Sequence, residues 1–166
     1  LKYNIMKNTI LVLVFIFGIK AQAQLIQGEL KIDNASKSEL RLKNNKAVNL
    51  YASFRENNHK INFVFTGTDI PLNPEKQEVV QFVFTTTIKK DGKTISSMKR
   101  APIPFFPGDM FMPVETFDFI SMLSNLQTNS NEMISEIPSG SYEIIIEAKA
   151  VGVKGTIAPI RMFLKI

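Results

Sequence analysis

Apolar and polar residues alternate along most of the chain with a period of two. Residues 25–33 read LIQGELKID, in which apolar positions alternate with charged ones. The same alternation recurs at 48–54 (VNLYASF) and 61–65 (INFVF). A period of two is typical of β-strands that bury one face and leave the other in water. The polar residues 56–60 between the last two segments predict that they form a hairpin.

The second half of the chain continues the strand pattern. Residues 79–88 (VVQFVFTTTI) are rich in β-branched and aromatic side chains, which favour strands. The Asp91-Gly92 pair then predicts a tight hairpin turn into a returning strand over 93–98. Prolines interrupt the pattern at 102–107, and a short strand is expected over 109–114.

The segment 137–148 (IPSGSYEIIIEA) contains a serine–glycine loop that resembles a nucleophile or phosphate site. It lacks the G-x-S-x-G spacing, and the residues that follow favour a strand instead of a helix. Its proline fixes one backbone dihedral and its glycine permits positive φ, so the loop predicts a turn. A strand over 142–149 follows, and the last strand is expected over 157–166 with a break at Pro159.

The period changes after Glu115, where apolar residues recur at steps of three and four. This spacing predicts an amphipathic helix near 115–126. About eight or nine short strands and one short helix, with frequent turn signals, are typical of a sandwich. The sequence therefore predicts an all-β fold, an immunoglobulin-like antiparallel β-sandwich with this one helix.

The N-terminal residues have the layout of a secretory signal peptide. Lys2 and Lys7 precede a run of eleven mostly apolar residues at 9–19, and Ala21-Gln22-Ala23 forms a small-x-small site. We expect cleavage after Ala23, which leaves 24–166 as a single domain. An uncleaved membrane anchor is the alternative, but the apolar run is shorter than the roughly 20 residues that a span requires.

Removal of this segment changes the charge balance. Three of the 20 basic residues and none of the 15 acidic ones lie in 1–23, so the remaining chain has a net charge of +2. A charge near zero argues against nucleic-acid binding, which requires a basic face. The chain has no cysteine, which excludes disulfides and cysteine-ligated metals. We expect an exported protein that is periplasmic, outer-membrane-associated or extracellular, with no membrane span once the signal is removed.

Residues of the second half also carry a family resemblance. The hairpin FVFTTTIKKDGKTI, the approach PFFPGDMFMP, the helix VETFDFISMLSNL and the strand entry IPSGSYEIIIEAKA follow one another. Over about residues 82–150 this order resembles the TANFOR-type domain of exported Bacteroidota proteins. The resemblance implies a β-rich, non-enzymatic surface module. The chain departs from that pattern at Ile137, where leucine is usual, and in lacking the paired cysteines near the end.

Two groups of residues are candidate binding surfaces. The first is aromatic and sulfur-rich, and it either fills the core or forms an exposed patch that contacts another protein. It comprises Phe105, Phe106, Met110, Phe111 and Met112. The second is basic, and it is either a solvated strand edge that resists aggregation or a contact for an anionic surface polymer. It comprises Lys89, Lys90, Lys93, Lys99 and Arg100.

Catalytic and metal-binding patterns are weak. The one histidine, His59, lies in the expected hairpin tip and is predicted to be solvated. Oxygen-bearing stretches at 33–36 and 67–69 supply too few ligands for calcium. The acids that could act in pairs are Asp109, Glu115, Asp118, Glu143 and Glu147, and no motif supports them. We therefore expect no catalytic residues, no metal and no cofactor.

These observations lead to one expected function and two alternatives. The expectation is a non-catalytic interaction or structural module of the bacterial envelope or cell surface, whose partner is an envelope or surface protein. The first alternative is a carrier of a lipid-like or glycan ligand in a β-sandwich or barrel cavity. The absence of tryptophan weakens the glycan version. An enzyme, such as a carboxylate hydrolase, ranks last.

Overall fold

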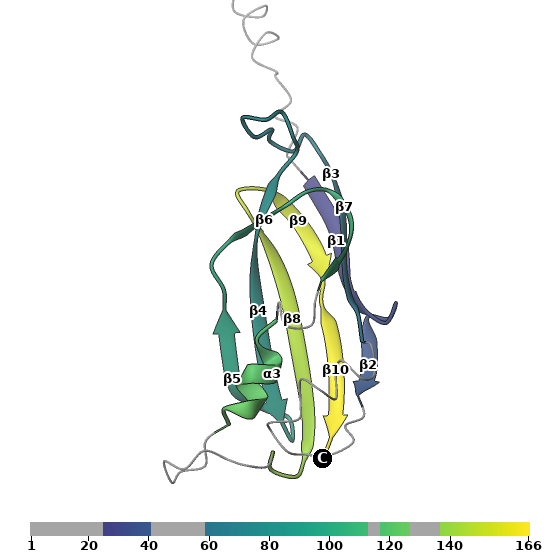
Figure 1. Ribbon diagram of the computed structural model, residues 1–166, viewed down its shortest axis with the longest axis vertical. Helices are drawn as coiled ribbons and strands as arrows, with labels where there is room; N and C mark the ends of the chain where they lie inside the picture. Colours follow the sequence, from purple (N-terminus) through teal and green to yellow (C-terminus); the bar gives the residue numbers. More distant parts are fainter. Residues whose placement is uncertain (1–24, 41–58, 113–116, 127–136) are drawn as a thin grey trace, which may run out of the picture.

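The computed structural model describes residues 25–40, 59–112, 117–126 and 137–166, which form two packed β-sheets (Figure 1). The first sheet has four strands in the order β7 (Gly108–Met112), β3 (Ile61–Thr68), β1 (Leu25–Ile32) and β9 (Lys154–Ala158). The second has the order β2 (Lys37–Leu40), β10 (Ile160–Lys165), β8 (Ser141–Val151), β4 (Val80–Lys90) and β5 (Lys93–Lys99). A sixth strand, β6 (Ile103–Phe105), also pairs with β4. The predicted all-β sandwich is confirmed.

Two strand pairs differ from the antiparallel arrangement that we expected. β1 pairs antiparallel with β3 but parallel with β9, and β10 pairs parallel with β2. Both sheets are therefore mixed. The chain changes sheets between β1 and β2 and again between β9 and β10, so β1 pairs with β9 in one sheet and β2 pairs with β10 in the other. Alternation along a strand reveals which face is buried, but it does not reveal the direction of the neighbouring strand.

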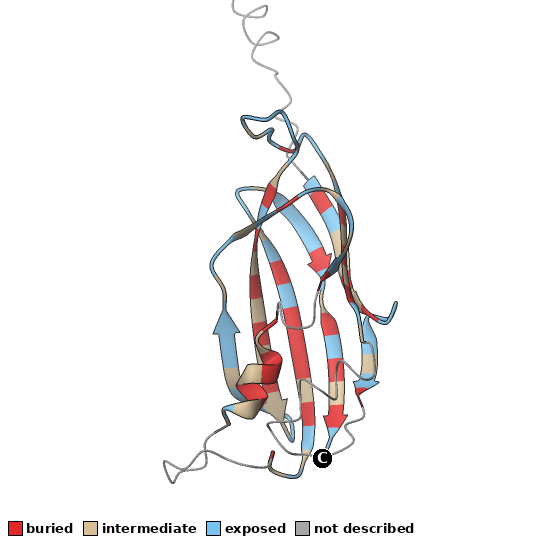
Figure 2. Cartoon of the chain, in the orientation of Figure 1, coloured by how far each residue is buried: buried red, intermediate tan, exposed pale blue. Residues whose placement is uncertain are grey.

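Alternate residues of the strands meet between the sheets and form one hydrophobic core, visible as red bands along the strands in Figure 2. Its centre is a cluster of aromatic rings whose centroids lie between 4.8 and 6.5 Å apart, mostly edge-to-face. The ring cluster comprises Phe63, Phe65, Phe82, Phe84, Phe105 and Phe117. Edge-to-face pairs are favourable because the positive ring edge meets the negative ring face.

Several local predictions are confirmed. Asp91 and Gly92 both have positive φ, 48° and 82°, and join β4 to β5. Positive φ at both central residues is the type I′ geometry that suits the twist of a hairpin. Pro159 separates β9 from β10, and the strand expected over 142–149 is β8, which extends one residue further at its start and two at its end. The strand expected at 48–54, part of its hairpin with 61–65, and the signal peptide expected at 1–23 lie outside the described residues.

The helix is shorter than the sequence pattern predicts. α3 spans Phe119–Ser124, and Asp118 is its N-cap residue. Phe117 continues the apolar spacing because it packs in the core, although its backbone is not helical. The predicted start near 115 is therefore wrong by several residues for the described part. The proline-interrupted stretch also contains a strand that we did not expect, β6. Among the described strands it pairs with β4 alone, and proline is tolerated on such an edge strand.

Candidate functional site

The aromatic segment crosses from one sheet to the other, and the structure divides its side chains into two groups. Phe105 ends β6 and lies in the core, and Met112 at the end of β7 is also buried. Phe106 and Phe111 are 49% and 68% exposed, and Met110 is half-buried. Phe105 and Met112 are therefore unavailable for contact with a partner. Of the exposed members, Phe111 lies on β7, which is the edge strand of the four-stranded sheet among the described strands, and Phe106 lies between β6 and β7.

Strand geometry explains why neighbours in this segment differ. Met110 lies opposite buried Phe63 of β3, so it faces the core. Phe111 lies opposite Asn62 and faces outward, because successive side chains of a strand point to opposite faces. We call β7 with Phe106 and Phe111 the aromatic edge.

The basic residues surround β5, which is the edge strand of the six-stranded sheet. Two of them have carboxylate partners. The guanidinium of Arg100 donates to both oxygens of Asp118, at 2.6 and 2.5 Å, and the Lys89 amine lies 3.5 Å from Glu143. The first of these pairs joins the residue after β5 to the N-terminus of α3.

The remaining lysines of this group are not neutralised in the same way. The Lys90 amine lies over the ring of Tyr142, 5.7 Å from its centroid. Lys93 and Lys99 are exposed at the two ends of β5, and within the described part of the chain neither forms an ion pair with a carboxylate. Among the described residues, this edge of the sheet therefore carries two lysines, Lys93 and Lys99, without a carboxylate partner.

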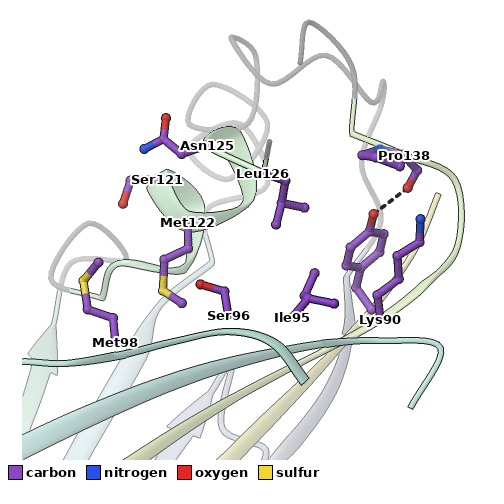
Figure 3. Close-up of a pocket in the computed structure, with 10 residues that line it drawn as sticks. Lys90, Ile95, Ser96, Met98, Ser121, Met122, Asn125, Leu126 and Pro138 are labelled. Atoms are coloured by element: carbon purple, nitrogen blue, oxygen red, sulfur yellow. Dashed lines mark hydrogen bonds between the residues drawn. The ribbon is translucent and has the colours of Figure 1, made fainter. Parts of the chain in front are cut away.

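A groove lies between α3 and β5 (Figure 3). It has a volume of about 430 Å³. Met122 and Leu126 on the helix side point toward Ile95 and Ser96 of the strand, and Met98 lines one end. The floor is largely apolar, and Ile95 and Met98 are each more than 40% exposed. The groove was not predicted from the sequence, although the two apolar side chains on an otherwise polar edge strand were a signal of it.

The start of β8 is held by a tyrosine. The Tyr142 hydroxyl donates a hydrogen bond to the carbonyl oxygen of Pro138 at 2.6 Å. Burial, and next the negative charge of Asp91, raise the pKa of Tyr142 above its ordinary value, so it remains a donor at neutral pH. A tyrosine that bonds back to the backbone before its strand is typical of Greek-key sandwiches. The serine–glycine segment is therefore the entry to a strand.

The candidate acids do not converge. Glu143 accepts a hydrogen bond from Arg161 and lies near Lys89 on the outer face of the six-stranded sheet. Burial raises the pKa of Glu143, but the bond from Arg161 and the two positive charges lower it more, and the net shift is downward. Glu147 lies four residues further along β8, about 13 Å away, beyond the separation found in glycosidase pairs.

The other expected sites are also separate. Asp118 is held by Arg100, Asp109 lies opposite Val64 of β3, and Glu115 is outside the described residues. His59 was expected to be solvated, but its side chain is only 16% exposed and its Nδ1 lies 2.6 Å from Asp33. That contact connects the start of β3 to the turn after β1. Among the described residues, no group of acids and histidines could hold a metal ion.

Comparison of the chain with protein-family models, with characterised proteins and with solved structures gives no match. The similarity to the TANFOR-type domain stays a prediction. In the part of the chain that the structure describes, no helix has the length and apolar character needed to cross a membrane.

Proposed function

We propose that the protein is an exported, non-catalytic interaction module of the bacterial envelope or cell surface, and that it binds another envelope protein through the aromatic edge. The observation that carries this proposal is the exposure of Phe111, which is 68% accessible on an edge strand. A phenylalanine in this position contributes nothing to the core. Exposed aromatic side chains beside an unpaired strand edge are favourable anchors for a partner.

Two further observations support an interaction role over the alternatives. The ring cluster occupies the centre of the sandwich, where a carrier would need space for its ligand. The described acids are held in separate ion pairs or lie on separate strands, whereas a hydrolase requires two of them at one place. The export signal and the similarity to a surface module agree with a location in the envelope.

Cross-linking in the native cells, followed by co-purification of the tagged protein and mass spectrometry, tests the proposal. We expect specific envelope proteins in the cross-linked fraction, and we expect them to be lost when Phe106→Ser and Phe111→Ser are combined. Val151→Ser is the matched control, because Val151 is an exposed apolar residue that lies on β8 of the other sheet and is not part of the aromatic edge. Circular dichroism and thermal melting establish that each variant is folded.

The same experiment can contradict the proposal. If the folded double variant retains every partner of the unmodified protein, the aromatic edge is not the binding surface. If the protein purifies alone and native mass spectrometry reveals a retained small molecule, the carrier function replaces the interaction module.

A further inference from the structure

The free edge of β5 has an unusual exposure for a seven-residue strand. Among the strands that the structure describes, β5 is the last of its sheet and pairs with β4 along one side. Six of its seven residues are exposed and Ser96 is half-buried, which Figure 2 shows as an almost continuously pale blue strand. In an antiparallel pair, alternate residues direct their N–H and C=O groups away from the partner strand. β5 therefore presents a row of backbone donors and acceptors to solvent.

This edge adjoins an apolar groove. Ser96 and Met98 pair with Ile88 and Thr86 of β4, whose side chains are buried, so they face the same side of the sheet as α3. A strand added beyond β5 would lie about 4.8 Å from it. Every second side chain of that strand would then lie against the groove between β5 and α3. The edge supplies hydrogen bonds and the groove supplies side-chain contacts, which are the two requirements of strand addition.

Charge determines the kind of strand that fits. Lys93 and Lys99 flank β5, and Lys90 lines the groove, whereas β5 itself carries no acid. Opposite charges on neighbouring strands stabilise pairing and like charges oppose it. An incoming segment with acidic residues near Lys93 and Lys99 would be attracted, and one with basic residues would be repelled.

The same charges disfavour a second copy of this chain. Two β5 strands paired antiparallel about Ser96 would set Lys93 of one copy directly opposite Lys99 of the other, at both ends. Lysines on edge strands commonly prevent such self-association. The lysines of β5 therefore favour an acidic strand of a partner protein over a second copy of β5.

We propose that β5 binds an extended, acidic segment of a partner protein, which adds a strand to the free edge and places apolar side chains in the groove between β5 and α3. This surface is separate from the aromatic edge, which belongs to the other sheet. The inference does not depend on the function proposed for Phe106 and Phe111, and each can fail alone.

A synthetic peptide tests the inference. The probe is a blocked nine-residue peptide in which glutamate alternates with valine, and its binding is followed by fluorescence anisotropy. We expect it to bind at least about tenfold more tightly than the same peptide with lysine in place of glutamate. We also expect its affinity to fall as the salt concentration is raised. Hydrogen exchange followed by mass spectrometry should show new protection at 93–99, because the free N–H groups of β5 acquire acceptors.

Variants locate the site. Ile95→Asp and Met98→Asp each place a negative charge in the groove, and we expect each to weaken binding by about tenfold or more. Leu72→Asp changes an apolar residue that is more exposed than Ile95 and Met98 and lies outside the groove, and we expect no loss of affinity. All three residues are exposed, so the variants should fold, and circular dichroism establishes this.

Three results would overturn the inference. The first is no binding of the acidic peptide at millimolar concentration. The second is binding that leaves exchange at 93–99 unchanged. The third is equal binding of dextran sulfate with no effect of Ile95→Asp or Met98→Asp, which would identify the lysines as a site for an anionic polymer and not for a strand.

Discussion

Phe105 and Phe106 are neighbours of identical chemistry, and the fold predicts opposite consequences of removing them. Phe105 is 9% exposed, and its ring lies 5.4, 6.1 and 5.5 Å from those of Phe63, Phe82 and Phe84. Phe106 is 49% exposed. Phe105→Ala would leave a cavity within the ring cluster, whereas Phe106→Ala would shorten a side chain that already lies half in water.

The expected magnitudes follow from this difference. A buried Phe→Ala change costs about 3–5 kcal/mol of unfolding free energy, because the apolar contacts are lost and the surroundings refill the cavity only partly. Half-exposed Phe106 buries about half as much surface and encloses no cavity, so its loss should cost about 1 kcal/mol. The two variants should therefore differ by about 2–4 kcal/mol, a large part of the 5–15 kcal/mol typical of a domain.

Urea unfolding of the protein without residues 1–23 measures both costs. The chain contains no tryptophan, so far-UV circular dichroism is the appropriate signal. Equal slopes of free energy against urea concentration for the two variants would establish that the comparison is valid. If the two costs agree within about 0.5 kcal/mol, the division of this segment into core and surface is wrong, and the aromatic edge loses its basis.

Three further predictions concern other parts of the fold. Tyr142→Phe should lower the unfolding free energy by about 1 kcal/mol in urea titrations, because the Pro138 carbonyl loses its donor. An unchanged unfolding free energy would show that this hydrogen bond contributes no net stability. The pKa of Glu143 is lowered in the folded protein, so its ionised form contributes stability above the ordinary glutamate pKa, and this contribution is lost as pH falls through the folded value. The unfolding free energy of the unmodified protein should therefore exceed that of Glu143→Gln by less in acid than at neutral pH. A difference in unfolding free energy that stays constant from pH 7 to 3 would contradict this. Gly155→Ala should cost at least about 2 kcal/mol in thermal or urea unfolding, since a Cβ would lie 2.1 Å from the Ile26 oxygen, and wild-type stability would argue against the parallel pairing of β1 with β9.

The sequence by itself determined the features that depend on neighbouring residues. Alternation at 61–65 and 79–88 identified β3 and β4, because burial of one strand face requires an apolar residue at every second position. Asp91-Gly92 specified a hairpin turn, because its geometry requires positive φ. Pro159 specified the break in the last strand, because proline cannot donate to a ladder.

The limits of the helix show how local signals are overridden. Phe117 fits the helical spacing but packs in the ring cluster outside α3. Apolar periodicity records which residues enter the core, and it cannot separate a helical residue from an adjacent one that is buried for another reason. α3 begins after its N-cap residue Asp118, whose carboxylate accepts hydrogen bonds from Arg100 and makes no capping bond to the helix.

Only the tertiary structure decided the candidate surfaces. The sequence placed Phe105, Phe106 and Phe111 in one group. Pairing of β6 with β4 and of β7 with β3 buried Phe105 and exposed Phe111, and Phe106 is exposed in the link between the two strands. The parallel pairs, the free edge of β5 and the groove beside α3 likewise depend on which segments become neighbours. These contacts join residues that are far apart in the chain, so their identity is set by the packing of the whole sandwich and not by any local pattern.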